Sequence, residues 1–273
     1  MLDRKKKTHR GFHGNVGGWQ EELYNSLYSK LCSLAAVVGL DEEQLKKYFN
    51  PIGTSNYLYQ LASSLQNSGN MCNSIRYNDP TSTNEKIIRS VLDNATMYRN
   101  WEELYQAMIA AGIRDGGVKK GRETNWQKYC RGLFDGITYL KNGGEEKIRQ
   151  LCSTSNIDEI INDEIIEIQK TIHGLGFALT CDWLKECGCT WLAKPDIHIK
   201  KVAGYIRQTF DNGDESLGDW DVIEFVYDWA KEIGKTAYEI DKIIWLLCTG
   251  DFYLNGIKIG RPLVEQTIKS IKK

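Results

Sequence analysis

A glycine turn followed by a carboxylate is the strongest chemical signal in the sequence. The turn follows an isoleucine-rich stretch and comprises His173, Gly174, Leu175 and Gly176. Glycines in front of a helix leave backbone N–H groups free to contact an anion, and the positive end of the helix dipole adds to the attraction. Farther along, Pro195 suits the first turn of another helix, so Asp196 is expected in that turn, where the dipole favours a carboxylate. The alternative is an ordinary αα-hairpin followed by a helix-capping aspartate.

Two polar stretches offer further contacts to a polyanion. The first ends an apolar helix that begins near Tyr57, and the second is the glycine-rich basic run at 112–122. The candidates are Gln66, Asn67 and Asn70 in the first stretch and Lys119 and Lys120 in the second. Glycine permits close backbone approach, and lysine neutralises phosphate. In both stretches the alternative is an exposed, solvated loop.

Helices must position these groups. Apolar residues recur at helical spacing along much of the chain, which predicts an all-α fold. The clearest ranges are 19–38, 126–140, 157–172 and 240–247. Asp41 with Gln44 matches a capping box, and Thr236 is a plausible N-cap. The only strand signal is a small hairpin over 252–259, where an Asn-Gly pair lies between short β-formers.

Bulk composition is that of an ordinary globular protein. The 273 residues carry a net charge of −1, so a nucleic-acid enzyme of this composition must gather its cations on one face. The sequence has neither an uninterrupted membrane span nor a secretory signal, so we expect a cytoplasmic protein, and we expect a monomer. The eight cysteines lack paired CxxC spacing, which favours buried free thiols over a metal site.

The segment from Ile172 to Val202 resembles the helix-hairpin-helix superfamily of base-excision DNA glycosylases, which includes endonuclease III and the adenine and 8-oxoguanine glycosylases. That family's hairpin typically reads Leu-Pro-Gly-Val-Gly, where this chain has Ile-His-Gly-Leu-Gly. The family's lysine, when present, falls at Ala178, and its catalytic aspartate lies eighteen residues later, at Asp196. The stretch that begins at Asp196 is similar to the family's Asp-x-His-x-x-Arg-Val. The similarity extends more weakly over 57–249.

The resemblance implies two helical lobes with the hairpin and the active site at the cleft between them. We expect three parts along the chain: an N-terminal helical extension (1–50) that packs on the core and matches nothing in the family, a helical lobe with a base-gap-filling loop (51–170), and a segment with the hairpin, the catalytic aspartate and the C-terminal helices (171–273). The hairpin is expected to bind the backbone of double-stranded DNA through its amides, often with a bound monovalent cation (K⁺ or Na⁺). Other expected DNA contacts are Gln66, Asn67, Asn70, His198, Lys200, Lys201, Lys119 and Lys120.

The expected chemistry is rupture of the N-glycosidic bond of a flipped base. Asp196 is expected to stabilise the oxocarbenium-like transition state and to orient water. Aromatic side chains that could stack on the base are Phe177, Trp191 and Trp245.

Three departures from the family select a branch. His173 replaces the proline of the turn, Ala178 replaces the lysine, and the C-terminal four-cysteine cluster of endonuclease III-like members is missing. We therefore expect a monofunctional glycosylase that needs no cofactor. One alternative is a lyase that uses a relocated amine, Lys185 or Lys194. Others are a glycosylase acting on hypermodified phage DNA in antiviral defence rather than in base-excision repair, a non-catalytic DNA-binding module, and a helical scaffold for protein interactions.

Overall fold

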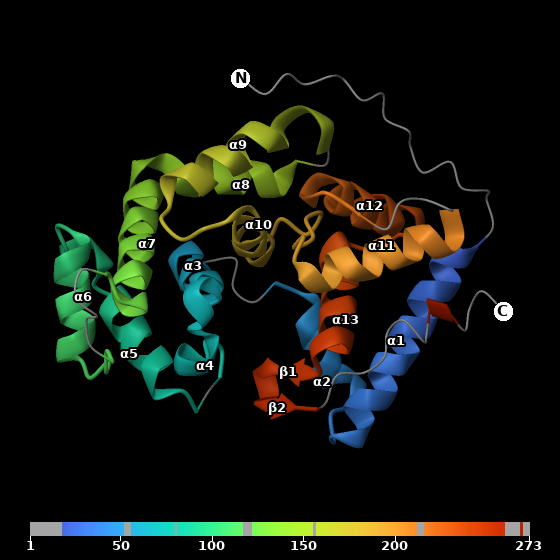
Figure 1. Cartoon of the computed structure of the whole chain (residues 1–273), viewed down its shortest axis with the longest axis horizontal. Coiled ribbons are helices and arrows are strands. Elements are labelled where there is room, and N and C mark those ends of the chain that lie inside the picture. Colours follow the sequence, from blue (N-terminus) through green and yellow to red (C-terminus); the bar gives the residue numbers. More distant parts are fainter. Residues whose placement is uncertain are drawn as a thin grey trace.

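The computed structural model describes residues 18–51, 56–79, 81–116, 122–154, 157–211, 216–259 and 268–269 (Figure 1). Its α-helices are α1 (Trp19–Val37), α2 (Glu42–Lys46), α3 (Tyr57–Leu65), α4 (Cys72–Ile75), α5 (Thr83–Leu92), α6 (Trp101–Ala110), α7 (Asn125–Tyr139), α8 (Glu145–Ser153), α9 (Ile157–Thr171), α10 (Phe177–Glu186), α11 (Ile197–Asp211), α12 (Asp219–Glu232) and α13 (Ala237–Thr249). Short helical turns are η1 (Lys47–Phe49), η2 (Ser68–Asn70), η3 (Ala95–Met97), η4 (Leu140–Gly144) and η5 (Tyr253–Asn255). The prediction of an all-α protein is confirmed. The hairpin-containing glycosylase fold stays a prediction.

Local signals account for several helix starts. Asp41 caps α2 in a capping box with Gln44, and Thr124 does the same for α7 with Gln127. The Thr236 side chain accepts the N–H of Glu239 at the start of α13. These bonds satisfy amide groups that have no partner within the helix.

The predicted small hairpin is present but short. Strands β1 (Asp251–Phe252) and β2 (Ile257–Lys258) pair antiparallel, with Asp251 opposite Lys258. The connection is η5 followed by Gly256 in the left-handed region, instead of a two-residue Asn-Gly turn. Glycine adopts this conformation without the steric cost of a Cβ.

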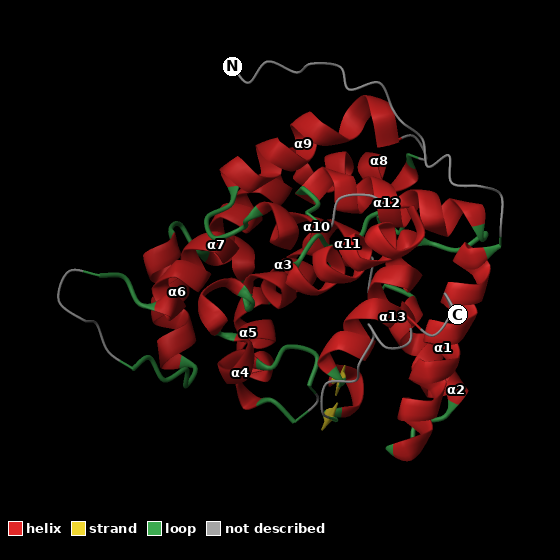
Figure 2. Cartoon of the chain, turned by 45° about the vertical axis from the view of Figure 1, so that its right-hand side comes forward, coloured by secondary structure: helices red, strands yellow, loops and turns green. Residues whose placement is uncertain are grey.

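Buried apolar residues form two clusters. The first cluster comprises residues between Leu61 and Leu192 together with Ile223. The second cluster joins residues 23–48 to residues from Ala193 onward, so the N-terminal α1 packs with the C-terminal α13. Figures 1 and 2 show α10 lying between the helices of these two groups. The division into three domains stays a prediction.

Candidate active site between the two clusters

The glycine turn joins α9 to α10. Gly174 has a φ of 83°, a left-handed conformation that favours glycine, and the Leu175 N–H returns to the carbonyl of Ile172 at 3.3 Å. The Asp135 carboxylate accepts the His173 N–H at 3.0 Å and ties the turn to α7. A Cβ at Gly132 of α7 would lie 2.4 Å from the His173 carbonyl oxygen, so the helix and the turn meet backbone to backbone.

The turn leaves donors available on its exposed side. Gly174 and Gly176 are exposed, and within the described residues neither backbone N–H has a hydrogen-bond acceptor. Gly176 is the N-cap residue of α10, where the helix dipole adds positive potential. A Cβ at Gly174 would lie 3.4 Å from Ser68 Oγ, so η2 packs beside the turn. Two segments singled out separately from the sequence thus lie next to each other.

Asp196 caps α11. Its Oδ1 accepts the N–H of His198 at 2.9 Å and that of Ile199 at 3.1 Å. Its Oδ2 accepts no hydrogen bond from the described residues, and the side chain is half-buried. The expectation that Pro195 opens this helix is wrong, because α11 begins at Ile197 and the side chain of Asp196 already supplies the cap.

The segment before Asp196 is held by α13. The buried Asp241 accepts the backbone N–H of Lys194 on Oδ2 at 2.7 Å and binds the ammonium of Lys185 on Oδ1. The backbone N–H of Tyr238, also in α13, bonds to the carbonyl of Thr190 at 2.9 Å. The chain that leads into Asp196 is therefore fixed at two points on one helix.

Further ion pairs join α10 to its surroundings. Lys194 Nζ lies 3.3 Å from Asp182, and Lys242 Nζ lies 2.7 Å from Glu186. The Tyr238 hydroxyl donates to the other Glu186 oxygen at 2.9 Å. We call these six charged residues the buried ion network: Asp182, Lys185, Glu186, Lys194, Asp241 and Lys242. The network crosses the boundary between the two apolar clusters.

In this network, burial and neighbouring charges shift the pKa values of the ionisable groups in opposite directions. Burial raises the pKa of Asp182, but the ammonium groups of Lys194, Lys185 and Lys242 outweigh it and lower that pKa to about 2. Burial lowers the pKa of Lys185, yet nearby carboxylates, Asp241 foremost, raise it above its ordinary value. The pKa of Lys242 is likewise raised, by Glu186 and Tyr253 against burial. Asp182 is thus anionic, and Lys185 and Lys242 are cationic, at neutral pH.

A cavity of about 380 Å³ opens at this boundary. All members of the network except Asp241 line it. Gln66 and Asn67 line it from the end of α3, and Trp245 and Tyr253 line it from α13 and η5. Its volume falls within the roughly 300–1,000 Å³ typical of small-molecule sites. The sequence did not single out Asp182, Glu186, Lys242 or Tyr253 as site residues.

The structure brings some predicted residues to the cavity and leaves others elsewhere. Of the three aromatic candidates, Trp245 alone lines it. Phe177 packs edge-on against Trp220 with ring centroids 5.0 Å apart, and Trp191 donates its indole N–H to the Leu151 carbonyl at 3.1 Å. Both are held by structural contacts away from the cavity lining, so they are not aligned with Trp245 as one base pocket.

The predicted polar contacts are also divided. Gln66 is buried and accepts the N–H of Tyr77 at 2.9 Å, while Asn67 is exposed. Lys200 pairs with Asp219 near the start of α11. His198 is half-buried and Lys201 is exposed. Lys119 and Lys120 lie outside the described residues, as does the side chain of Asn70.

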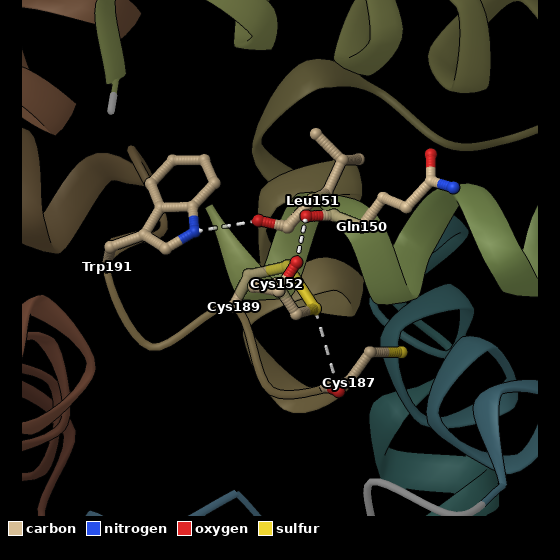
Figure 3. The surroundings of a disulfide bond; sticks show 7 residues. Gln150, Leu151, Cys152, Cys187, Cys189 and Trp191 are labelled. Atoms are coloured by element: carbon tan, nitrogen blue, oxygen red, sulfur yellow. Dashed lines mark hydrogen bonds between the residues drawn. A yellow bond between two sulfur atoms is a disulfide. The ribbon is translucent and has the colours of Figure 1, made fainter. Parts of the chain in front are cut away.

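The expectation of free thiols is wrong for two cysteines. Cys152, at the end of α8, and Cys189, after α10, form a disulfide (Figure 3). Trp191 contacts the same end of α8 through its bond to Leu151, so the segment that follows α10 is attached to α8 at two neighbouring points. Cys181 and Cys187 remain buried thiols whose pKa is raised by burial.

No protein-family model, curated protein or solved structure matches this chain. Among the described helices, none is long and apolar enough to cross a membrane. Across the same described residues, no group of three or more His, Cys, Asp or Glu side chains could hold a metal ion.

Proposed function

We propose that the chain is a DNA glycosylase that hydrolyses the N-glycosidic bond of a damaged or modified base flipped out of the duplex. The observation that carries the proposal is the contact of η2 with the glycine turn, through Ser68 and Gly174. One segment was singled out for filling the gap in the duplex and the other for binding its backbone, and a shared DNA surface requires them to be adjacent. The resemblance to the helix-hairpin-helix glycosylases supplies the reaction.

The turn supports the binding part of the proposal. The exposed N–H groups of Gly174 and Gly176, at the start of α10, suit phosphate oxygens. Asn67 is exposed, follows α3 towards η2 and can reach a base that has lost its partner. A monovalent cation at the turn stays a prediction, and no step depends on it.

Asp196 supports the chemical part. Its Oδ1 accepts hydrogen bonds from two backbone N–H groups, which fixes the position of the carboxylate. Oδ2 remains available to face a sugar. As the glycosidic bond breaks, positive charge develops on that sugar, and a fixed carboxylate stabilises the charge and orients the attacking water. Water supplies the new C1′–O bond, and the departing base takes up a proton.

Single-turnover excision tests this proposal. Duplexes carrying uracil, 8-oxoguanine, alkylated purines or modified cytosines are incubated with wild type and with Asp196→Asn. Asparagine still caps a helix, so the variant should fold and bind DNA but lose excision. Asp41→Asn is the matched control, because Asp41 also caps a helix, α2, that is separate from the glycine turn and α11. Neither Asp41 nor Asp196 lines the cavity. Excision by Asp196→Asn at the wild-type rate contradicts the assignment, and no excision of any modified base by wild type contradicts the function.

A further inference from the structure

Two buried carboxylates of the cavity wall, Glu186 and Asp182, already have partners. Glu186 receives Lys242 on one oxygen and the Tyr238 hydroxyl on the other. Asp182 Oδ2 receives Ser64 at 3.2 Å and Lys194 at 3.3 Å, and Oδ1 faces Lys185 at 3.6 Å. Each of these carboxylate oxygens therefore has a cation or a hydroxyl against it. A ligand that enters beside them finds little spare acceptor capacity.

Donors on the same wall exceed their partners. An ammonium group has three N–H donors. Lys194 meets one described partner, Asp182, and Lys242 meets two, Glu186 and the Tyr253 hydroxyl at 2.9 Å. Gln66 uses its carbonyl oxygen to accept the Tyr77 N–H, so its amide N–H donors remain. Next to Asp182 and Glu186, the spare hydrogen-bonding capacity of the cavity wall thus lies on the donor side.

One wall of the cavity is flat and apolar. Trp245 is half-buried, and its ring lies edge-on to Tyr253 with centroids 5.8 Å apart. An aromatic face of this kind stacks on any planar heterocycle and does not by itself select one. The choice among planar bases therefore depends on the polar groups near the ring, which include the ammonium and amide N–H donors described above.

We propose that this cavity takes a neutral or anionic planar base through a carbonyl-rich edge, and that it disfavours cationic alkylated purines. The inference rests on the proposed glycosylase function, because that function makes a nucleobase the ligand. The contacts that it invokes are all made by residues that line the cavity. A carbonyl edge receives hydrogen bonds from Lys194, Lys242 and Gln66 next to the Trp245 ring. A fixed positive charge on the base meets the ammonium groups of Lys194 and Lys242 instead, and the Asp182 and Glu186 oxygens beside them already have partners. The other two carboxylates that line the cavity, Asp79 and Asp251, are each paired with a cation that also lines it, Arg76 and Lys258 respectively.

Binding of nucleosides tests the inference without excision. Full-length protein is titrated with 8-oxo-2′-deoxyguanosine, 2′-deoxyuridine and the cationic 1-methyl-2′-deoxyadenosine, and bound fractions are measured by ligand-observed NMR. We expect the carbonyl-bearing nucleosides to bind about tenfold more tightly or better, the scale of a hydrogen bond to a charged group. Equal or tighter binding of the cationic nucleoside overturns the inference, as does the absence of binding by all three.

Variants assign the preference to the cavity. Lys194→Met should reduce the preference about tenfold, and Lys194→Arg should retain it, because arginine keeps the donors. Lys147→Met is the matched control, since Lys147 also pairs with one carboxylate, Glu167 at 3.1 Å, but does not line the cavity. If Lys194→Met keeps the wild-type preference for carbonyl-bearing nucleosides, other residues select the base, and the assignment of the preference to this cavity is contradicted. If Lys194→Met does not fold, the wild-type titration decides.

The excision assay on the panel of modified duplexes distinguishes failure of this inference from failure of the proposed glycosylase function. Excision of uracil or 8-oxoguanine without 3-methyladenine supports both. Excision of 3-methyladenine in preference to the carbonyl-bearing bases leaves the glycosylase proposal standing and overturns the base class. Carbonyl-selective nucleoside binding without excision of any base leaves the ligand class standing and contradicts the glycosylase.

Discussion

Asp241 accepts the backbone N–H of Lys194 at 2.7 Å, two residues before Asp196. The same carboxylate holds the ammonium of Lys185 from α10. One buried side chain of α13 therefore fixes both the approach to the proposed catalytic carboxylate and the helix that follows the glycine turn. Two parts of the site that are distant in sequence depend on it.

Replacing Asp241 should destabilise the protein strongly. Asp241→Asn leaves the buried ammonium of Lys185 without its closest partner, which costs about 3–5 kcal/mol of unfolding free energy. Urea titration followed by circular dichroism measures the loss. Asp219→Asn, which breaks the more exposed pair with Lys200, should cost about 1 kcal/mol or less. Similar losses in the two variants would show that the buried pair has no special role.

Acid should weaken the protein through Asp182. Its pKa in the folded state is about 2, below the value of about 3.9 for an unfolded chain. A lowered carboxylate pKa stabilises the fold fully above about pH 5, and that contribution is lost as the pH falls towards 2. Unfolding free energy measured from pH 6 to pH 2 should therefore fall more steeply in wild type than in Asp182→Asn. Parallel curves would contradict this sign.

Borohydride should not trap wild-type protein on abasic DNA. Schiff-base formation needs a neutral amine, and the raised pKa of Lys185 keeps that amine protonated at neutral pH. Ala178→Lys, which places an amine at the position where the resembled family has its lysine, is the gain-of-function comparison. A trapped wild-type adduct that maps to Lys185 or Lys194 would establish the lyase alternative.

Removing the disulfide should lower the unfolding free energy by about 2–4 kcal/mol, because the cross-link limits the unfolded chain. The bond joins cysteines 37 residues apart, so Cys152→Ser releases a long loop. Cys72→Ser, at a half-buried free thiol, should change stability much less. A dithiol reductant should shift the urea midpoint of wild type and leave that of Cys152→Ser unchanged. The absence of a shift would mean that the bond does not form in solution.

Structural features that depend on a single helix could be predicted from the sequence. The apolar stripes of α7 and α13 and the cap at Asp41 depend on neighbours within a few residues, and the structure has them. Of the stripe predicted over 157–172, the described side chains of Ile165, Ile168 and Ile172 are buried. The buried ion network could not be predicted in this way. Asp182 and Lys185 look like the exposed face of an amphipathic helix, and only the folded chain brings Lys194 to Asp182 and Asp241 to Lys185. A useful signal was present at Asp241 and Lys242, which are two charged residues between the apolar Ile240 and Ile243.

The cysteine pair illustrates the same limit. Nothing near Cys152 or Cys189 marks them as partners, since their proximity depends on how α8 meets the end of α10. The turn and Asp196 were found because their spacing is local to one segment. The cavity was not found, because its lining comes from residues between Ser63 and Lys258.

The Cys152–Cys189 bond also has a topological consequence. Helix α9, the glycine turn and α10 all lie between the two cysteines, so the polypeptide there is a closed covalent ring. One protease cut anywhere inside that ring opens it without releasing a fragment. A singly nicked molecule would run as one species on a non-reducing gel and as two after reduction, so the proposed DNA-facing turn can survive a backbone break that would divide an uncrosslinked chain.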